Sequence, residues 1–160
     1  MKVALAARGI DDPGALVAEV GAGRSPTTRP SRCIPGGTGA FLVGQEATRR
    51  MLPRGSGTIL FTGASASVKG YAQSAPFAMG KFALRGLAQS MARELGPQGI
   101  HVAHVVVDGG IRSARRPEAA DRPDALLDPD AIAASYLHLV QQHRSAWTFE
   151  LEVRPWVEKF

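Results

Sequence analysis

The chain has 160 residues, of which 44% are hydrophobic and 21% are charged, and its net charge is +5. This length and composition fit one ordinary globular domain with a real hydrophobic core. A membrane span needs about 18 consecutive apolar residues, and the sequence has no such run. The N-terminal apolar run is too short for a signal peptide, so we expect a cytoplasmic protein.

Metal and nucleic-acid binding are both disfavoured by the residue pattern. Cys33 is the single cysteine, so an internal disulfide or a cysteine metal cluster cannot form. The four histidines lack any metal-ligand spacing and are interpreted as surface or core imidazoles. The sequence pI near 10.0 invites a nucleic-acid interpretation. However, the basic residues are mostly scattered arginines without alternating aromatics, so we expect no such partner.

The N-terminal part is predicted to contain a strand, a helix and an irregular linker. Lys2 to Ala7 is a short apolar run of the kind found in buried parallel strands. An acidic pair followed by Pro13 indicates a helix start, and Ala15 to Val20 would continue that helix. Arg24 to Gly39 is rich in proline, glycine, serine and threonine and predicts a linker. So long a linker inside a compact domain is unusual and suggests a missing segment.

From residue 40 onward the pattern alternates between helices and strands. The expected elements are helices at Ala40–Leu52, Phe77–Leu95 and Asp130–Gln142, and strands at Thr58–Thr62, Ile100–Val107 and Ala146–Val153. Because each strand-to-strand crossover contains a helix, a parallel sheet is the natural packing, with right-handed connections. We therefore expect one α/β domain over residues 1–160, with a strand and a helix in 1–23, the linker in 24–39 and the main body in 40–160.

Apolar positions indicate which helix faces pack on the sheet. In the first helix the candidate core residues are Phe41, Leu42, Met51 and Leu52. In the long helix the apolar positions 84, 87, 91 and 95 follow the helical period.

Three stretches together resemble the short-chain dehydrogenase/reductase family. They are GTILFTGASAS, the FAMGK segment at the start of the long helix, and GPQGIHVAHVVVDGG. The resemblance covers Gly39 to Phe160. It implies a Rossmann-like parallel sheet that lacks part of the N-terminal half. It also implies NADP or NAD as cofactor and a small carbonyl or alcohol as substrate, whose identity the sequence does not reveal.

The resemblance implies a catalytic Tyr-x-x-x-Lys pair on the long helix. Residues four apart share one helix face, so the lysine can lower the pKa of the tyrosine and also hold the cofactor's ribose hydroxyls. Lys81 stands at the lysine position, but Phe77 occupies the tyrosine position. Phenylalanine has no proton to give. Tyr71 precedes Lys81 by ten residues, off the helix face, and is not expected to replace the tyrosine.

Other family positions also depart from the pattern. The family serine would fall on Ala64, so Ser65 is the candidate that a one-residue shift would supply, and Ser67 flanks the position as well. The asparagine that orients a relay water would fall near Gly36. An Asp-Gly pair replaces the usual Pro-Gly after the next strand. The resemblance implies cofactor contacts from Lys81, Gly63, Asp108, Gly109 and Ile111.

The glycine-rich phosphate turn of the family is incomplete. Thr62-Gly63 follows a good strand but lacks the later glycines, and Thr38-Gly39 follows a poor strand. The N-terminal VALAAR resembles the family's second strand, where Arg8 would favour a 2′-phosphate. This strand either has the same position in the sheet as in the family or lies beside Thr58–Thr62. We expect the second arrangement, because an unpaired edge inside a sheet is costly.

These observations favour a shortened oxidoreductase by descent whose activity is impaired. An alternative is a non-catalytic relic or pseudo-enzyme. It would dimerise, or dock on a full-length relative, through the helices at 40–52 and 77–95. A third interpretation is a nucleotide-binding module without chemistry.

Overall fold

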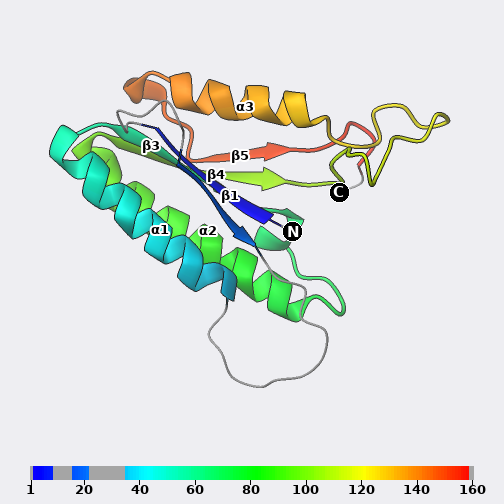
Figure 1. Ribbon diagram of the computed structural model, residues 1–160, viewed down its shortest axis with the longest axis horizontal. Coiled ribbons are helices and arrows are strands. Elements are labelled where there is room, and N and C mark those ends of the chain that lie inside the picture. Colours follow the sequence, from blue (N-terminus) through cyan, green and yellow to red (C-terminus); the bar gives the residue numbers. More distant parts are fainter. Residues whose placement is uncertain (1, 9–15, 22–34, 159–160) are drawn as a thin grey trace.

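The structure of the protein is a computed structural model that describes residues 2–8, 16–21 and 35–158 (Figure 1). The strands form one sheet in the order β2-β1-β3-β4-β5. Their bounds are Lys2–Arg8 for β1, Leu16–Gly21 for β2, Gly57–Thr62 for β3, Ile100–Val107 for β4 and Glu150–Val153 for β5.

The three later strands are parallel, as the alternating sequence pattern predicts. Thr62 lies opposite Val105 in the β3–β4 pair, and Val107 lies opposite Val153 in the β4–β5 pair. The long helix α2 connects β3 to β4 and spans Ala75–Leu95. The helix α3 connects β4 to β5 and spans Pro129–Gln141. The prediction of a Rossmann-like parallel sheet with flanking helices is therefore confirmed for this part of the chain.

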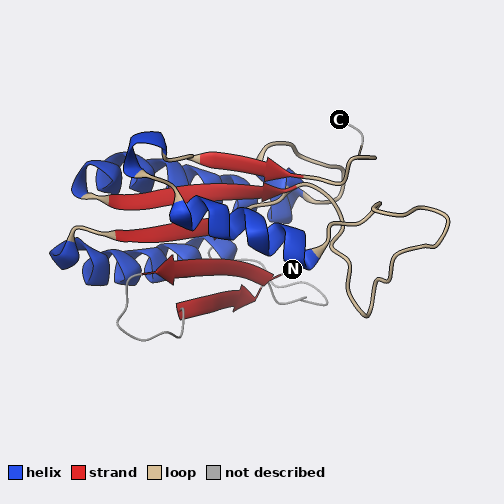
Figure 2. Cartoon of the chain, turned by 90° about the horizontal axis from the view of Figure 1, so that it is seen from above, coloured by secondary structure: helices blue, strands red, loops and turns tan. Residues whose placement is uncertain are grey.

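Helices cover both faces of the sheet, so the molecule has three layers. The helix α1 spans Pro35–Met51 and lies beside α2 on one face, while α3 lies on the other (Figures 1 and 2). Successive side chains of β3 alternate between the two cores, as a strand dictates. Ile59 and Phe61 pack with α1 and α2, and Leu60 packs on the α3 side.

The N-terminal strand lies next to β3, which confirms the expected placement of Lys2–Ala7. Leu5 of β1 lies opposite Phe61 of β3, but the two strands run antiparallel, so the sheet is mixed. The predicted helix at Ala15–Val20 is wrong. Leu16–Gly21 forms the strand β2, paired antiparallel with β1. A six-residue segment with two valines is too short for a stable isolated helix, and pairing satisfies the open edge of β1. The predicted helix start before Pro13 lies outside the described residues.

Two element boundaries differ from the sequence prediction. The helix α1 begins at Pro35, inside the predicted linker 24–39, because proline is well tolerated in the first turn of a helix. Residues 24–34 of that linker lie outside the described part. The predicted strand Ala146–Val153 shortens to β5, because a 3₁₀ turn occupies Arg144–Ala146. The last helix starts as predicted, since the Asp128 carboxylate accepts a hydrogen bond from the backbone N–H of Asp130.

The predicted contacts of the two long helices are partly confirmed. On α2, Leu84, Met91 and Leu95 are buried and Leu87 packs against the same core. Of the four core residues predicted for the first helix, only Met51 is buried. Phe41, Leu42 and Leu52 are exposed, because α1 packs through its small residues, including Ala40 and Ala47. Among the helices that the structure describes, none is long and apolar enough to span a membrane.

Candidate functional site at the carboxyl edge of the sheet

Lys81 lies at the centre of the candidate site, on the buried face of α2. Its side chain is 4% exposed, and its Nζ donates a hydrogen bond of 2.9 Å to the backbone oxygen of Thr62. Thr62 is the last residue of β3, so this bond fixes the ammonium group at the carboxyl edge of the sheet. Burial lowers the pKa of Lys81 to about 8, because the charged form is poorly solvated there.

Phe77 lies one helical turn before Lys81, as the resemblance implies. The centre of its ring is 5.9 Å from the Lys81 Nζ, within the range of a cation–π contact. The ring is 36% exposed, so it lies at the surface of the site rather than in the core. At the position where the resemblance implies a proton donor, the chain therefore has an aromatic ring without a hydroxyl group.

The turn after β3 carries the serine candidates. Ala64, at the family serine position, is buried. Ser67 is also buried, and its Oγ accepts a hydrogen bond of 3.1 Å from the backbone N–H of Ala64, so this hydroxyl closes the turn. Ser65 is partly exposed and opens the short 3₁₀ helix at this point. Ser65 is thus the serine at this edge whose hydroxyl is not held by the turn.

The loop after β4 supplies the other predicted residues. The Asp108 carboxylate is buried, and its Oδ2 lies 3.6 Å from the Lys69 Nζ. The pKa of Lys69 is raised, first by the Tyr71 hydroxyl and further by Asp108. Gly109 has φ of 148°, and a Cβ there would lie 2.7 Å from the Cδ of Pro155, so only glycine fits without strain. Ile111 is exposed.

All the predicted site residues therefore follow the carboxyl ends of β3 and β4 or lie on the first turns of α2. Ligands of open α/β sheets bind in this region, outside the carboxyl ends of the strands. The structure brings Lys81 and Phe77 into contact range. Tyr71 lies in the loop before α2, exposed and beside Lys69.

A partly buried polar network behind this edge was not predicted from the sequence. The Arg85 guanidinium donates two hydrogen bonds of 2.7 Å to the two carboxylate oxygens of Glu150. The Nδ1 of His104 lies 3.0 Å from the Glu150 Oε2, and the imidazole is fully buried. Burial lowers the pKa of His104, while Arg85 holds the pKa of Glu150 below its usual value. The signal for this network was the presence of histidines in β4 and of glutamates in β5.

The same network explains the glycine at the start of the turn. A Cβ on Gly63 would collide with the His104 ring and lie 2.8 Å from the Ser67 Oγ. The close approach of these three residues therefore requires glycine at position 63. The His104 Nε2 is buried and has no hydrogen-bond partner within the described part of the chain.

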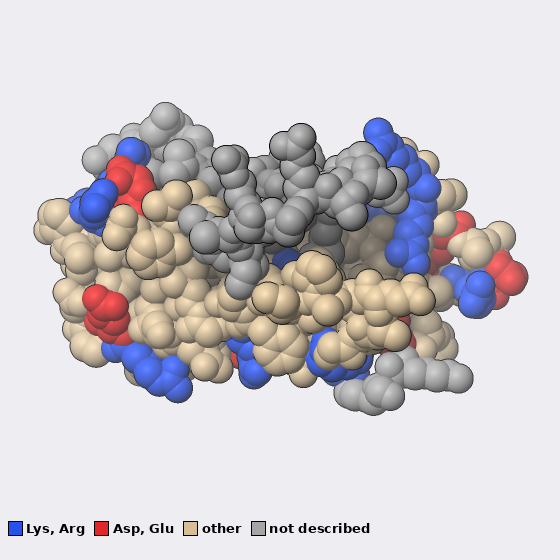
Figure 3. Space-filling model, turned by 90° about the horizontal axis from the view of Figure 1, so that it is seen from below, with Lys and Arg blue, Asp and Glu red and all other residues tan. Residues whose placement is uncertain are grey.

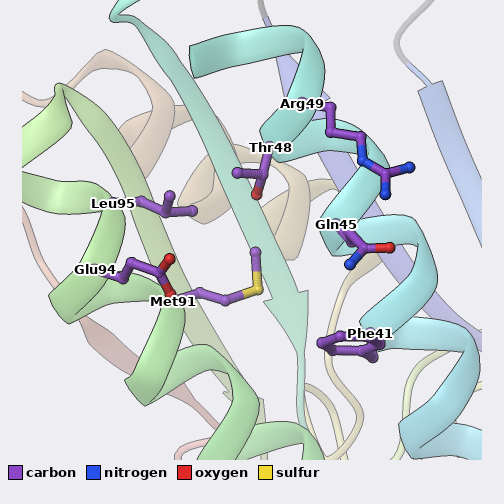
Figure 4. A pocket seen from close by; sticks show the side chains of 7 residues that line it. All are labelled: Phe41, Gln45, Thr48, Arg49, Met91, Glu94 and Leu95. Carbon is purple, nitrogen blue, oxygen red and sulfur yellow. The ribbon is translucent and has the colours of Figure 1, made fainter.

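A groove runs between α1 and α2 on the outer side of the helical layer (Figure 4). Its volume is about 220 Å³, with an apolar floor from Met91 and Leu95 and with Phe41 at one end. Arg49 and Glu94 lie on opposite helices at its rim. This groove is separate from the carboxyl edge. Among the described residues, no three His, Cys, Asp or Glu side chains are grouped closely enough to hold a metal ion.

Comparison with known proteins agrees with the resemblance seen in the sequence. The profile of the short chain dehydrogenase family matches residues 37–122, which is more than half of the chain. The chain therefore belongs to the short-chain dehydrogenase family.

The relatives show how much of a whole family member is present. The chain is 33% identical to the 3alpha-hydroxysteroid dehydrogenase of Mediterraneibacter gnavus in an alignment 124 residues long that covers 71% of this chain and 49% of that protein. A short-chain dehydrogenase from Rhodopseudomonas palustris is 46% identical with a TM-score of 0.58, over 78% of this chain and 48% of that one. The acetoin dehydrogenase YohF from Salmonella typhimurium is 28% identical with a TM-score of 0.66, over 76% and 51%. The chain thus spans about half the length of these relatives.

Proposed function

We propose that this oxidoreductase by descent retains a site for NADP(H) or NAD(H) but reduces carbonyl groups poorly. The observation that carries the proposal is the Phe77 ring beside the Lys81 ammonium. The lysine keeps the position and burial that a cofactor ligand needs, whereas the residue that would deliver a proton is an unreactive ring.

Lys81 fits a ribose-binding role. A lysine ammonium has three N–H donors, and the bond to the Thr62 oxygen occupies one of them. The other two are available for the ribose hydroxyls of a nicotinamide nucleotide. Gly63 on one side, and Asp108, Gly109 and Ile111 on the other, would flank the nicotinamide ring, which supplies the hydride when the cofactor is bound.

Proton delivery is the step that this chain performs badly. Reduction of a carbonyl group leaves negative charge on its oxygen, and a positioned general acid typically contributes about 100- to 10,000-fold to the rate. Phe77 cannot donate a proton. The Ser65 hydroxyl would hydrogen-bond the oxygen and stabilise its charge, but a serine is a weak acid. We therefore expect low turnover with any small carbonyl or alcohol substrate.

Calorimetric titration with NADPH and NADH tests the proposal directly. Micromolar affinity for either cofactor, reduced in a Lys81→Met variant, would support it. Leu137, on the far helix α3, offers a control position, and a Leu137→Ala variant should bind like the wild type. No heat at millimolar cofactor, from protein shown to be folded by circular dichroism, would refute it. Cofactor binding with no turnover in any variant would instead favour a nucleotide-binding module without chemistry.

One observation favours the alternative of an interaction protein. The α1–α2 layer exposes several large apolar side chains, namely Phe41, Leu42, Met79 and Phe82. Exposed apolar surface beside a groove is typical of protein interaction sites. The partner in this case would be a second copy of the chain or a related full-length subunit.

Sedimentation of the purified chain tests this alternative. A concentration-dependent dimer that Phe41→Glu dissociates would support pairing through the α1–α2 layer. The matched Leu137→Glu change on α3 introduces the same charge on another face and should leave the dimer intact. A chain that stays monomeric at every concentration would exclude the homodimer.

A further inference from the structure

The loop after β4 holds an arginine against a glycine close to the candidate site. A Cβ on Gly110 would collide with the Arg116 guanidinium, so this group lies directly on the glycine. Two backbone hydrogen bonds of 3.0 Å between Ser113 and Arg116 close the turn that brings the arginine back. Gly110 itself is fixed, because its oxygen accepts a hydrogen bond of 2.8 Å from the Leu127 N–H. The guanidinium therefore lies against the backbone three residues after the end of β4, while the Arg116 side chain is exposed to solvent.

No carboxylate of the described residues balances the charge of Arg116. Arg112, in the same loop, forms ion pairs with Asp128 and Glu118. Within the part of the chain that the structure describes, no ion pair is recorded for Arg115 or Arg116. Basic side chains are spread over the face seen from below, and several lie toward the end of the molecule that carries this loop (Figure 3).

A second cation, Lys69, contacts Asp108, the residue two positions before Gly110. Lys69 approaches the buried Asp108 carboxylate at 3.6 Å and is 42% exposed, so it keeps a free side toward solvent. Asp108 and Gly110 follow Val107, the last residue of β4, by one and three positions. At roughly 3.3 Å per extended residue, the two residues that these cations contact both lie within about 10 Å of the strand end. The Asp108 carboxylate offsets one of these two positive charges, that of Lys69.

We propose that Arg116, assisted by Lys69, binds a carboxylate or phosphate group at the mouth of the candidate site. The inference rests on the proposed function, because it assigns an anionic substrate or cofactor group to the same edge of the sheet. A planar guanidinium recognises such oxyanions through paired hydrogen bonds. The anion is either a group on the substrate or the pyrophosphate of the cofactor. Both share this chemistry.

Titration with inorganic phosphate and with malonate, at low ionic strength, tests the site without any turnover. We expect Arg116→Ala to weaken binding by about tenfold or more, the usual scale for a lost charge-assisted hydrogen-bond pair. Gly110→Ala keeps every charge but displaces the guanidinium, so it should weaken binding in the same direction. Arg115→Ala removes the same charge one residue away and should change binding less than about twofold.

Repeating the titration with NADPH present distinguishes the two sources of the anion. Competition between phosphate and NADPH would assign the site to the cofactor, and unchanged or tighter phosphate binding would assign it to the substrate. If NADPH does not bind at all, the proposed function fails, while the phosphate titration still decides the anion site. Equal losses in Arg115→Ala and Arg116→Ala, or no binding of either anion to the folded wild type, would overturn the proposal.

Discussion

The Lys81 ammonium lies 5.9 Å from the centre of the Phe77 ring, and the two residues are four positions apart on α2. Residues at this spacing project from the same helix face. The geometry of a proton donor next to its activating lysine is therefore present, although the donor atom is missing. A hydroxyl added to the ring would extend from a group that is already placed beside the lysine.

The Phe77→Tyr variant should gain carbonyl reductase activity. A tyrosine there would have its pKa lowered by the neighbouring ammonium and could protonate the developing alkoxide. We expect an increase of about 100-fold or more in NADPH oxidation with a panel of small ketones and aldehydes. Phe82→Tyr is the matched control, because Phe82 is an exposed phenylalanine on the same helix but not at the family position. Equal rates in the two variants would contradict the assignment of position 77.

The parallel half of the fold was predictable because each of its elements carries its own local signal. β3 and β4 are apolar runs bounded by glycines, and the start of α3 has an acidic cap before a proline. The strand β2 gave no such signal. LVAEV is short enough to suit a helix or a strand, and only the open edge of β1 decides between them. The direction of β1 is likewise set by its partner rather than by its own residues.

The site was predictable where it depends on spacing along one element, and not where it depends on contacts between elements. The four-residue spacing of Phe77 and Lys81 predicted that both side chains lie on the same face of the helix. The ion pair of Lys69 with Asp108 joins two loops that are far apart in the sequence. The stacking of Arg116 on Gly110 requires a turn whose residues show no strong local preference. Contacts of this kind follow only from the complete backbone arrangement.

Replacing Lys81 by methionine should stabilise the protein at neutral pH. The pKa of this lysine falls from 10.5 to about 8 on folding, so burying its charged form costs about 3 kcal/mol. The lost hydrogen bond to Thr62 offsets about 1 kcal/mol of that. Urea unfolding at pH 7 should therefore show a gain of about 1–2 kcal/mol.

The pH dependence of the same variant provides a second check. Between pH 8 and 10.5 the unfolded wild type binds more protons at this site than the folded one. The free energy of unfolding should therefore rise through this window, and Lys81→Met should abolish that rise. Lys69→Met is the control, because the pKa of Lys69 is raised on folding and removing it cannot abolish the increase. An unchanged alkaline profile in Lys81→Met would contradict the burial of the charge.

Gly63→Ala should destabilise the fold chiefly through its contact with His104. The added methyl would collide with the buried His104 ring, and overpacking of this kind costs about 1–3 kcal/mol. In a His104→Ala background the collision partner is gone, so the same change should cost far less. Urea unfolding of the four proteins in this double-mutant cycle measures the coupling. Additive costs would show that another neighbour limits position 63. Gly70→Ala, where nothing lies within 4 Å of an added Cβ, is the control.

His104 should make the protein lose stability in mild acid. Burial lowers its folded-state pKa, while the unfolded chain takes up a proton near pH 6.5. Below that pH the unfolded state binds more protons, so the free energy of unfolding falls by up to about 1.4 kcal/mol per pH unit. Glu150 adds a second loss at lower pH, because its carboxylate has a lowered pKa in the folded state and is protonated more readily in the unfolded chain.

A His104→Gln variant separates the two contributions. Glutamine does not titrate, so the decrease between about pH 6.5 and 4.5 should flatten, while the loss below pH 4.5 that belongs to Glu150 should remain. Urea unfolding at half-unit pH steps measures both slopes. His138→Gln on the exposed face of α3 removes a solvent-facing imidazole and should leave the profile unchanged. The same slope in wild type and His104→Gln would mean that the buried imidazole takes up its proton without unfolding. Its pairing with Glu150 would then offset the cost of burial.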